Sequence, residues 1–338
     1  EEAEQWGFGP SDRHLVCSPL HHSVAIRFAA GTLLAGGEVV VVDHFSVDAV
    51  LEAVRELAPT TTFMAPAHLQ RLHAAGMLEV LAGFTQLVHA GAPCPRPLKH
   101  AAIEVMGASR VWEFYGSTEG QFSAATASEW LQRPGTVGRA RRHRRLFVAE
   151  VDPARSDDPH GRAAPLVETG RGVIWCEAPS WARFSYWRDP DKTAKTWRTS
   201  PVGAPCFTVG DLGRLDADGY LYLEGRRNDL IITGGVNVYP AEVEAELASA
   251  PGVAEVAVFG VDDETWGQRV CAAIVPASSG VDLDVVRAHA RARLGAHKRP
   301  KELFVVGELP RTSTGKLRRE AVAELLGPDD EEAVGSGA

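Results

Sequence analysis

The sequence predicts a mixed α/β fold in three parts. These are a mainly parallel sheet covered by helices, a small antiparallel β-barrel or sheet, and a small α+β domain at the C-terminal end. Three patterns predict it. In the first third, apolar strand-like runs alternate with amphipathic helical stretches. Short β-prone runs separated by Gly, Pro and Asp turns occupy residues 135–225. Beyond residue 228, strand and helix patterns mix.

In the first part, strands and helices should follow one another along the chain. Residues 39–42 are all valine, as expected of a strand that is covered on both faces. Ser46 is a good N-cap, and apolar residues follow it at helical spacing over residues 47–57. The same reasoning predicts strands at 60–64, 87–88 and 111–114 and helices at 67–75 and 96–106.

Turn residues mark the elements of the other two parts. Asp216-Ala217-Asp218-Gly219 is a hairpin turn pattern, and Pro240 suits the first turn of a helix because its missing N–H costs nothing there. The expected strands are 145–151, 172–176, 206–209, 213–215, 220–223, 253–259, 270–275 and 301–306. The expected helices are 241–247, 282–294 and 320–326.

The Gly-rich segment around residues 225–229 is the expected domain boundary. A chain of 338 residues suits two or three domains rather than one. We expect a partial N-terminal domain over 1–227 and a mobile α+β domain over 228–338. Within the first, the α/β sheet should occupy 1–134 and the barrel-like part 135–227.

The charge and the lengths of the apolar runs argue against nucleic acid and membranes as general partners. The formal net charge is −9, which does not resemble a general nucleic-acid binder, and no apolar run approaches the length of a membrane span. One basic cluster lies at 139–145, and we expect a solvated loop or hairpin there rather than a phosphate-binding track.

The cysteines and the first residues bear on the compartment. The five cysteines are widely spaced and contain no Cys-x-x-Cys pair, which argues against a disulfide framework or a zinc site. This usage favours a reducing compartment, and we expect the cytoplasm. The first residues carry no signal-peptide pattern and residue 1 is not methionine, so we expect the chain to begin inside a longer sequence.

Several short segments together carry a family resemblance. They are Tyr115-Gly116-Ser117-Thr118-Glu119, Gly210-Asp211, the stretch from 225 to 240, and Thr312-Ser313-Thr314-Gly315-Lys316. This set resembles the signature blocks of the adenylate-forming superfamily, which includes acyl-CoA synthetases and peptide-synthetase adenylation domains. The resemblance implies that a small carboxylic acid is activated with ATP and Mg²⁺ and passed to coenzyme A.

Lys316 is the candidate catalytic cation. Adenylation joins two anions, so a site for it needs cations and oriented donors where charge accumulates, and a lysine ammonium is a compact movable charge. The resemblance places the lysine of the adenylation half-reaction at Lys316. A surface lysine before the last helix is the plain alternative. A Walker A loop is excluded, because Pro310 stands where that motif requires glycine and Leu317 where it requires Ser or Thr.

Two turns at the ends of predicted strands are candidate nucleotide contacts. Open α/β sheets place ligands at the carboxyl ends of their strands, and Tyr115-Gly116-Ser117-Thr118-Glu119 directly follows one. The resemblance implies that Thr118 binds the α-phosphate and that Glu119 holds Mg²⁺, a hard cation that prefers oxygen. A plain strand-to-loop turn is the alternative. Gly91-Ala92-Pro93, one strand earlier, resembles the adenine-side turn.

The remaining assignments also follow from the resemblance. Asp211 and Arg226 would bind the ribose, although Val209 stands where a threonine is usual. Asn228 would be the hinge about which the C-terminal domain rotates, Gly234 would line the thiol channel, and His22 would gate the acyl pocket. A β-turn aspartate and a structural histidine are the plain alternatives for Asp211 and His22.

The sequence leaves the activity of this chain and its acceptor open. The family's Ser/Thr/Gly-rich phosphate loop has no match, so we expect weak support for pyrophosphate release. We predict an acid–thiol ligase of the acyl-CoA synthetase type. A carrier-protein thiol or an amine acceptor is one alternative, and a catalytically silent nucleotide-binding fragment is another. Aromatic, medium-chain and polycyclic acids all stay open, as does a homo-oligomer.

Overall fold

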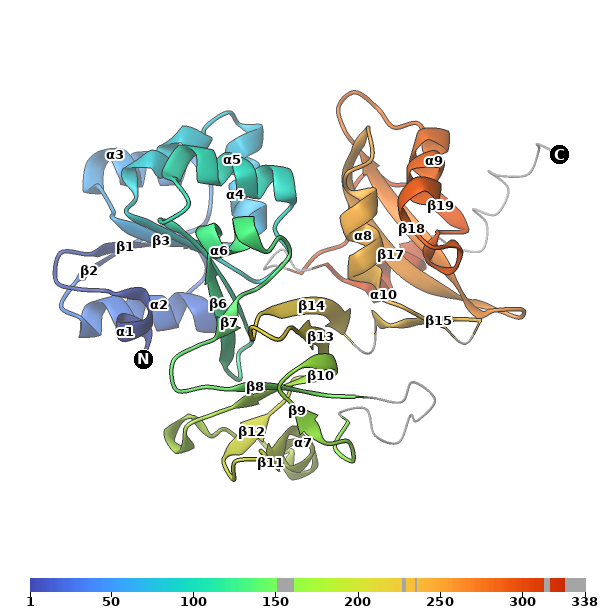
Figure 1. The fold of residues 1–338 in the computed structure, drawn as a ribbon. Coiled ribbons are helices and arrows are strands. Elements are labelled where there is room, and N and C mark those ends of the chain that lie inside the picture. The colour runs from blue at the N-terminus through green and yellow to red at the C-terminus, as the bar shows by residue number, and fades with distance from the viewer. Residues whose placement is uncertain (151–160, 227–228, 235, 313–316, 326–338) are drawn as a thin grey trace. The chain divides into compact units, whose positions relative to one another are not determined.

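The computed structural model describes residues 1–150, 161–226, 229–234, 236–312 and 317–325, and the chain divides into two compact units, Glu1–Leu223 and Glu224–Ala338. Figure 1 shows the elements of both. The expected boundary at 227/228 falls on residues outside this description. The predicted mixed α/β class is confirmed, with one mainly parallel and two mainly antiparallel sheets.

A seven-stranded sheet forms the first part of unit 1. Its first five strands in spatial order are parallel, the sixth runs antiparallel to them, and the seventh runs antiparallel to the sixth. In that order the strands are β2 (Glu38–Val41), β1 (Arg13–Val16), β3 (Thr61–Met64), β4 (Gln86–His89), β5 (Val111–Gly116), β6 (Gln121–Thr126) and β7 (Arg139–Ala140).

Helices cover both faces of this sheet (Figure 1). One face packs against α3 (Val47–Leu57), α4 (Pro66–Ala74) and α5 (Arg96–Met106) through aliphatic side chains. The other face packs against α1 (Glu2–Trp6) and α2 (Ser23–Leu34) through a cluster of aromatic side chains. Burial of this apolar surface is the main driving force for the layer. The predicted cap of α3 is confirmed, because the Ser46 hydroxyl accepts from the Ala49 N–H at 3.0 Å.

The second part of unit 1 is an antiparallel sheet. Its central strand β10 (Gly170–Glu177) pairs with three others, and α7 (Pro190–Thr196) precedes β11. The described strands have the order β11-β12-β10-β13-β14, with β8 beside β10 and β9 beside β8. Of the two predicted alternatives, a small barrel or a sheet, these strands form a sheet without closure. The other strands are β8 (Leu146–Ala149), β9 (Leu166–Val167), β11 (Trp197–Thr199), β12 (Pro205–Phe207), β13 (Asp211–Leu215) and β14 (Leu221–Arg226).

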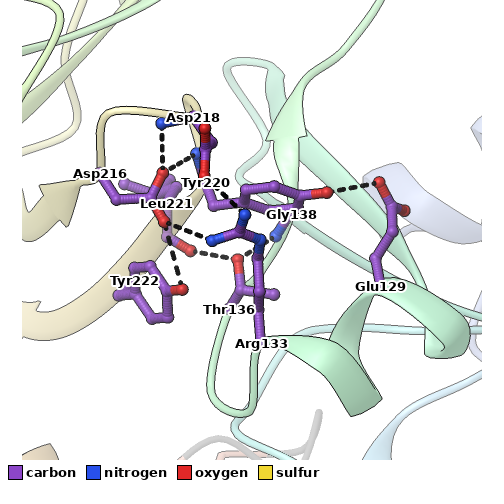
Figure 2. A network of polar contacts seen from close by, with 9 residues as sticks. All are labelled: Glu129, Arg133, Thr136, Gly138, Asp216, Asp218, Tyr220, Leu221 and Tyr222. Atoms are coloured by element: carbon purple, nitrogen blue, oxygen red, sulfur yellow. Dashed lines mark hydrogen bonds and ion pairs between the residues drawn. The ribbon is translucent and has the colours of Figure 1, made fainter.

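A polar network fixes the β13–β14 hairpin to the residues that follow α6 (Ala127–Gln132). Figure 2 shows Arg133 donating to Asp218 at 2.6 Å, with its guanidinium 4.4 Å from the centre of the Tyr220 ring. The Tyr220 hydroxyl donates to Glu129 on α6 at 3.2 Å. The Thr136 hydroxyl donates to the Leu221 carbonyl at 2.9 Å. These contacts hold the β13–β14 hairpin, at one edge of the antiparallel sheet, against α6 and the residues that follow it.

The basic cluster at 139–145 differs from the expected solvated loop. The Arg141 side chain is only 1% exposed and lies 3.3 Å from the Glu2 carboxylate, and Arg144 is 5% exposed and pairs with Glu1 at 3.2 Å. The prediction is therefore wrong for these two arginines, because acidic residues at the start of α1 lie against them. Burial lowers the pKa of Arg141 more than the nearby glutamates raise it.

Unit 2 is a small α+β domain. Its two long strands form an antiparallel hairpin, and β19 joins that hairpin in parallel. Helices α8 and α9 pack on one apolar cluster and α10 on another. The elements are β15 (Ile231–Thr233), β16 (Val236–Val238), α8 (Pro240–Leu247), β17 (Val253–Asp263), β18 (Gly267–Pro276), α9 (Leu283–Arg293), β19 (Glu302–Val305) and α10 (Arg319–Leu325). Over the described residues of both units, no helix is long and apolar enough to cross a membrane.

Candidate active site

The candidate nucleotide contacts gather at one edge of the parallel sheet. Strands β4 and β5 are neighbours and run in parallel, so the turn Gly91-Ala92-Pro93 after β4 and the loop 117–119 after β5 emerge side by side. Gly91 has φ of +94°, a conformation that favours glycine. The sequence predicted the place of the loop after β5 at the carboxyl edge of the sheet, and its nucleotide role stays a prediction.

The loop after β5 is tight because two glycines allow close approach. The Ser117 N–H donates to the Gly120 carbonyl at 2.7 Å, which closes the turn between β5 and β6. A Cβ on Gly116 would lie 2.9 Å from the Gln121 Cα, and a Cβ on Gly120 would lie 2.7 Å from the Phe207 ring. Thr118 at the tip of this loop is exposed, so its hydroxyl can meet a ligand.

Glu119 is held by a tyrosine from the loop that precedes α7. The Tyr186 hydroxyl donates to Glu119 Oε1 at 2.8 Å, from a position 67 residues further along the chain. Burial alone would raise the pKa of Glu119, but the hydrogen bonds from Tyr186 and Ser117 and the charge of Lys192 outweigh it and leave the pKa below the ordinary glutamate value. Burial and the same hydrogen bond raise the pKa of Tyr186 to about 12. Glu119 is therefore an anion and Tyr186 a donor at neutral pH.

Asp211 and Tyr115 meet across the two sheets of unit 1. The Tyr115 hydroxyl donates to Asp211 Oδ2 at 2.6 Å, which joins the last residues of β5 to the first residue of β13. Asp211 therefore opens a strand, and the expected strand over 206–209 is wrong at its end, because β12 stops at Phe207. The turn between them is ordered by the Thr208 hydroxyl, which donates to Ile174 O at 2.7 Å and accepts from Gly210 N at 3.0 Å.

His22 lies at the N-terminal end of α2, at the edge where β1 also ends. Its ring centre is 4.3 Å from that of His21, and its Nε2 atom is shielded from solvent without a hydrogen-bond partner among the described residues. Burial and the His21 charge lower the pKa of His22, so the imidazole is neutral at pH 7. This is compatible with contact to an apolar acyl group, and the gating role stays a prediction.

A buried ion pair supports the turn after β4. Lys99, on the first turns of α5, pairs with Glu113 on β5, and both side chains are almost fully buried. The Lys99 ammonium also lies 4.3 Å from the centre of the Trp130 ring. Burial raises the pKa of Glu113 despite the opposing lysine. This pair fixes the start of α5, and hence the Gly91 turn, relative to β5.

Arg27 and Tyr186 are site residues that the sequence did not indicate. Arg27 on α2 donates through Nη2 to the Thr118 carbonyl oxygen at 2.8 Å, across 91 residues of sequence. Both residues act on the loop after β5 through long-range contacts, and neither lies in a motif. For Arg27, the only local signal in the sequence was its place as a lone arginine in an apolar helical stretch.

Four of the sequence-predicted residues belong to unit 2 or lie outside the described residues, so their place relative to this edge is untested. Gly234 belongs to unit 2, where it has φ of +56° and donates to the Trp266 carbonyl at 2.7 Å. Lys316 and Asn228 lie outside the described residues. Arg226 is the last residue of β14. The catalytic, hinge, ribose and thiol-channel roles of these residues stay predictions.

Comparisons with known proteins identify the family. The model of the AMP-binding enzyme family matches residues 1–186, and that of the AMP-binding enzyme C-terminal domain matches residues 242–316. The chain belongs to the AMP-binding enzyme family. The resemblance to adenylate-forming enzymes is thus confirmed.

Relatives and solved structures agree with this assignment. A 2-succinylbenzoate–CoA ligase of Geobacillus kaustophilus is 37% identical over 325 residues, covering 95% of this chain and 62% of the relative. The structure of ATP-bound MatB from Rhodopseudomonas palustris has a TM-score of 0.83 at 28% identity, covering 96% of this chain and 62% of that one. The amide bond synthetase McbA from Marinactinospora thermotolerans has a TM-score of 0.83 at 32% identity, with 96% and 65% covered. The chain thus spans about three fifths of the length of such relatives.

Proposed function

We propose that this chain carries the adenylation chemistry of an acid–thiol ligase. A substrate carboxylate oxygen attacks the α-phosphorus of ATP, the bond to the β-phosphate oxygen breaks, and pyrophosphate leaves with its electron pair. The thiol of coenzyme A then attacks the acyl carbon of the acyl-AMP, gives up its proton, and AMP leaves. The observation that carries the proposal is the loop after β5, held beside the β4 turn with Asp211 brought to it by Tyr115.

The described residues suit the nucleotide side of this reaction. Asp211 can accept hydrogen bonds from the ribose hydroxyls, and the exposed Thr118 hydroxyl can donate to an α-phosphate oxygen on which charge accumulates. Gly116 lets the backbone approach the nucleotide closely. We assign Lys316 as the cation between carboxylate and phosphate, Arg226 as a second ribose contact, and Asn228 as the hinge between the two steps.

Glu119 fits a role as the protein ligand of Mg²⁺. Its carboxylate is ionised, half-buried and oriented by Tyr186, and magnesium commonly uses one or two carboxylates together with substrate phosphates and water. The described residues contain no cluster of three or more His, Cys, Asp or Glu that would make an all-protein cage, which is compatible with this mode. When bound, the ion would neutralise charge on the phosphates.

The acid and the acceptor remain proposals at the level of class. The 2-succinylbenzoate–CoA ligase among the relatives favours coenzyme A and an aromatic acid. The similarity to an amide bond synthetase favours an amine acceptor as the second candidate. A carrier-protein thiol, a homo-oligomer and a cytoplasmic location also stay proposals.

ATP–pyrophosphate exchange with a panel of carboxylic acids tests the proposed function. We expect exchange that depends on one class of acid and is lost in Lys316→Ala, while AMP still binds to the variant. Arg318→Ala, two residues away in the same basic segment, is the matched control and should retain exchange. AMP binding without exchange for any acid would instead favour the catalytically silent nucleotide-binding fragment. Absence of both AMP binding and exchange would contradict the proposal altogether.

A further inference from the structure

Among the described residues, a hydrogen bond connects helix α2 to the loop after β5. Helix α2 begins directly after His22, and Arg27 lies on its second turn. The Arg27 guanidinium donates to the main-chain carbonyl of Thr118 at 2.8 Å. The helix and the loop are 91 residues apart in sequence, so no local structure enforces this contact.

The loop needs such an anchor at this point. Its internal bonds run from Ser117 to the Gly120 carbonyl, and Tyr186 holds the Glu119 carboxylate. Neither contact fixes the peptide plane of Thr118, whose side chain is exposed at the tip. The bond from Arg27 sets the direction of that carbonyl, and with it the direction of the Thr118 side chain.

We infer that Arg27 is a positioning residue, which orients Thr118 for the nucleotide phosphate and couples that loop to the helix that begins after His22. The inference rests on the proposed function only for the identity of the ligand. If binding of the acid moves the start of α2, this hydrogen bond would transmit the movement to Thr118. The acid and the nucleotide should therefore affect one another's affinity. Arginine suits the task because its planar guanidinium offers several N–H donors in a fixed geometry.

Two measurements on the full chain with Arg27→Gln and Arg27→Lys test the inference. The first is hydrogen exchange of peptides covering 116–121 without any ligand. We expect several-fold faster exchange in Arg27→Gln, a smaller increase in Arg27→Lys, and no change in the control Arg55→Gln, which removes an exposed arginine on α3. Unchanged exchange in Arg27→Gln would overturn the positioning role, whether or not the chain is a ligase.

The second measurement is the affinity for AMP and ATP by calorimetry. We expect the dissociation constant to rise about fivefold to tenfold in Arg27→Gln and to be partly restored in Arg27→Lys, with thermal stability close to wild type. In pyrophosphate exchange the same variants should raise KM for ATP more than they lower kcat. Equal nucleotide affinity in wild type and Arg27→Gln would overturn the inference. No nucleotide binding by wild type would refute the proposed function, and hydrogen exchange would then decide the inference alone.

Discussion

Removal of the Tyr186 hydroxyl, in Tyr186→Phe, should raise the pKa of Glu119. The hydroxyl donates to Glu119 Oε1 at 2.8 Å, and it is the strongest of the contacts that lower the pKa of this carboxyl. A hydrogen bond to a charged group contributes about 1.5–3 kcal/mol when it is buried. Because Glu119 is only half-buried, water replaces part of the interaction, and we expect the free energy of unfolding to fall by about 1 kcal/mol at pH 7.

The sign of the pH dependence follows from the direction of the pKa shift. The pKa of Glu119 is lower in the folded chain than in the unfolded chain, so the contact stabilises the fold above the unfolded pKa. This contribution is lost as the pH falls through the folded pKa. The difference in the free energy of unfolding between wild type and Tyr186→Phe should therefore have its largest value at pH 6–8. It should shrink below about pH 4 and vanish in stronger acid. Urea unfolding at a series of pH values measures it.

A second effect should appear in magnesium binding. Loss of the residue that orients a metal-binding carboxylate typically costs about tenfold in affinity. We expect that loss for Mg²⁺ in the presence of ATP. The matched control is Tyr220→Phe, which removes a hydroxyl bonded to Glu129 at 3.2 Å far from the loop. The reasoning is refuted if both variants change magnesium affinity equally, or if Tyr186→Phe leaves the pH dependence of stability unchanged.

Two further predictions concern the support of the site. Lys99→Met leaves the Glu113 carboxyl buried without its partner, so we expect the free energy of unfolding in denaturant to fall by about 3–5 kcal/mol. The double variant Lys99→Met/Glu113→Leu should regain most of this loss. A double variant no more stable than the single one would contradict the pairing. Gly120→Ala adds a Cβ that would lie 2.7 Å from the Phe207 ring, and we expect a loss of about 1–3 kcal/mol and weaker nucleotide binding. Phe207→Leu in the same chain should relieve part of that loss, and failure to do so would point to backbone strain instead.

Elements with local signals were predictable from the sequence. Helix α3 is marked by Ser46 and an apolar stripe, and α5 was predicted at its observed bounds, 96–106. The loop after β5 was assigned to the carboxyl edge of the sheet because it directly follows a predicted strand. In each case the cap, the turn or the hydrophobic period lies within a few residues of the element it specifies.

Features set by distant contacts were not predictable. Helix α2 has Phe28 buried on one side and Leu33 and Leu34 exposed on another, so its apolar residues show no single face. Tyr186 reaches Glu119 across 67 residues, and no motif announces it. Arg141 was taken for a solvated residue because a run of arginines has that average behaviour, whereas Glu2 lies against it in the fold. Such pairings depend on the chain topology, which amino-acid composition and hydrophobic periodicity do not determine.

The proposed nucleotide site is tested most directly at the proposed contact between Asp211 and the ribose. We would measure the dissociation constants of AMP and 2′,3′-dideoxy-AMP for wild type, Asp211→Asn and the control Asp218→Asn, whose carboxylate binds Arg133 in the hairpin turn. A carboxylate that accepts both hydroxyls should make wild type prefer AMP by at least about tenfold. We expect Asp211→Asn to lose that preference and Asp218→Asn to keep it. If wild type binds both nucleotides equally, or if Asp211→Asn weakens both by the same factor, Asp211 does not hold the ribose and the proposed nucleotide site is wrong.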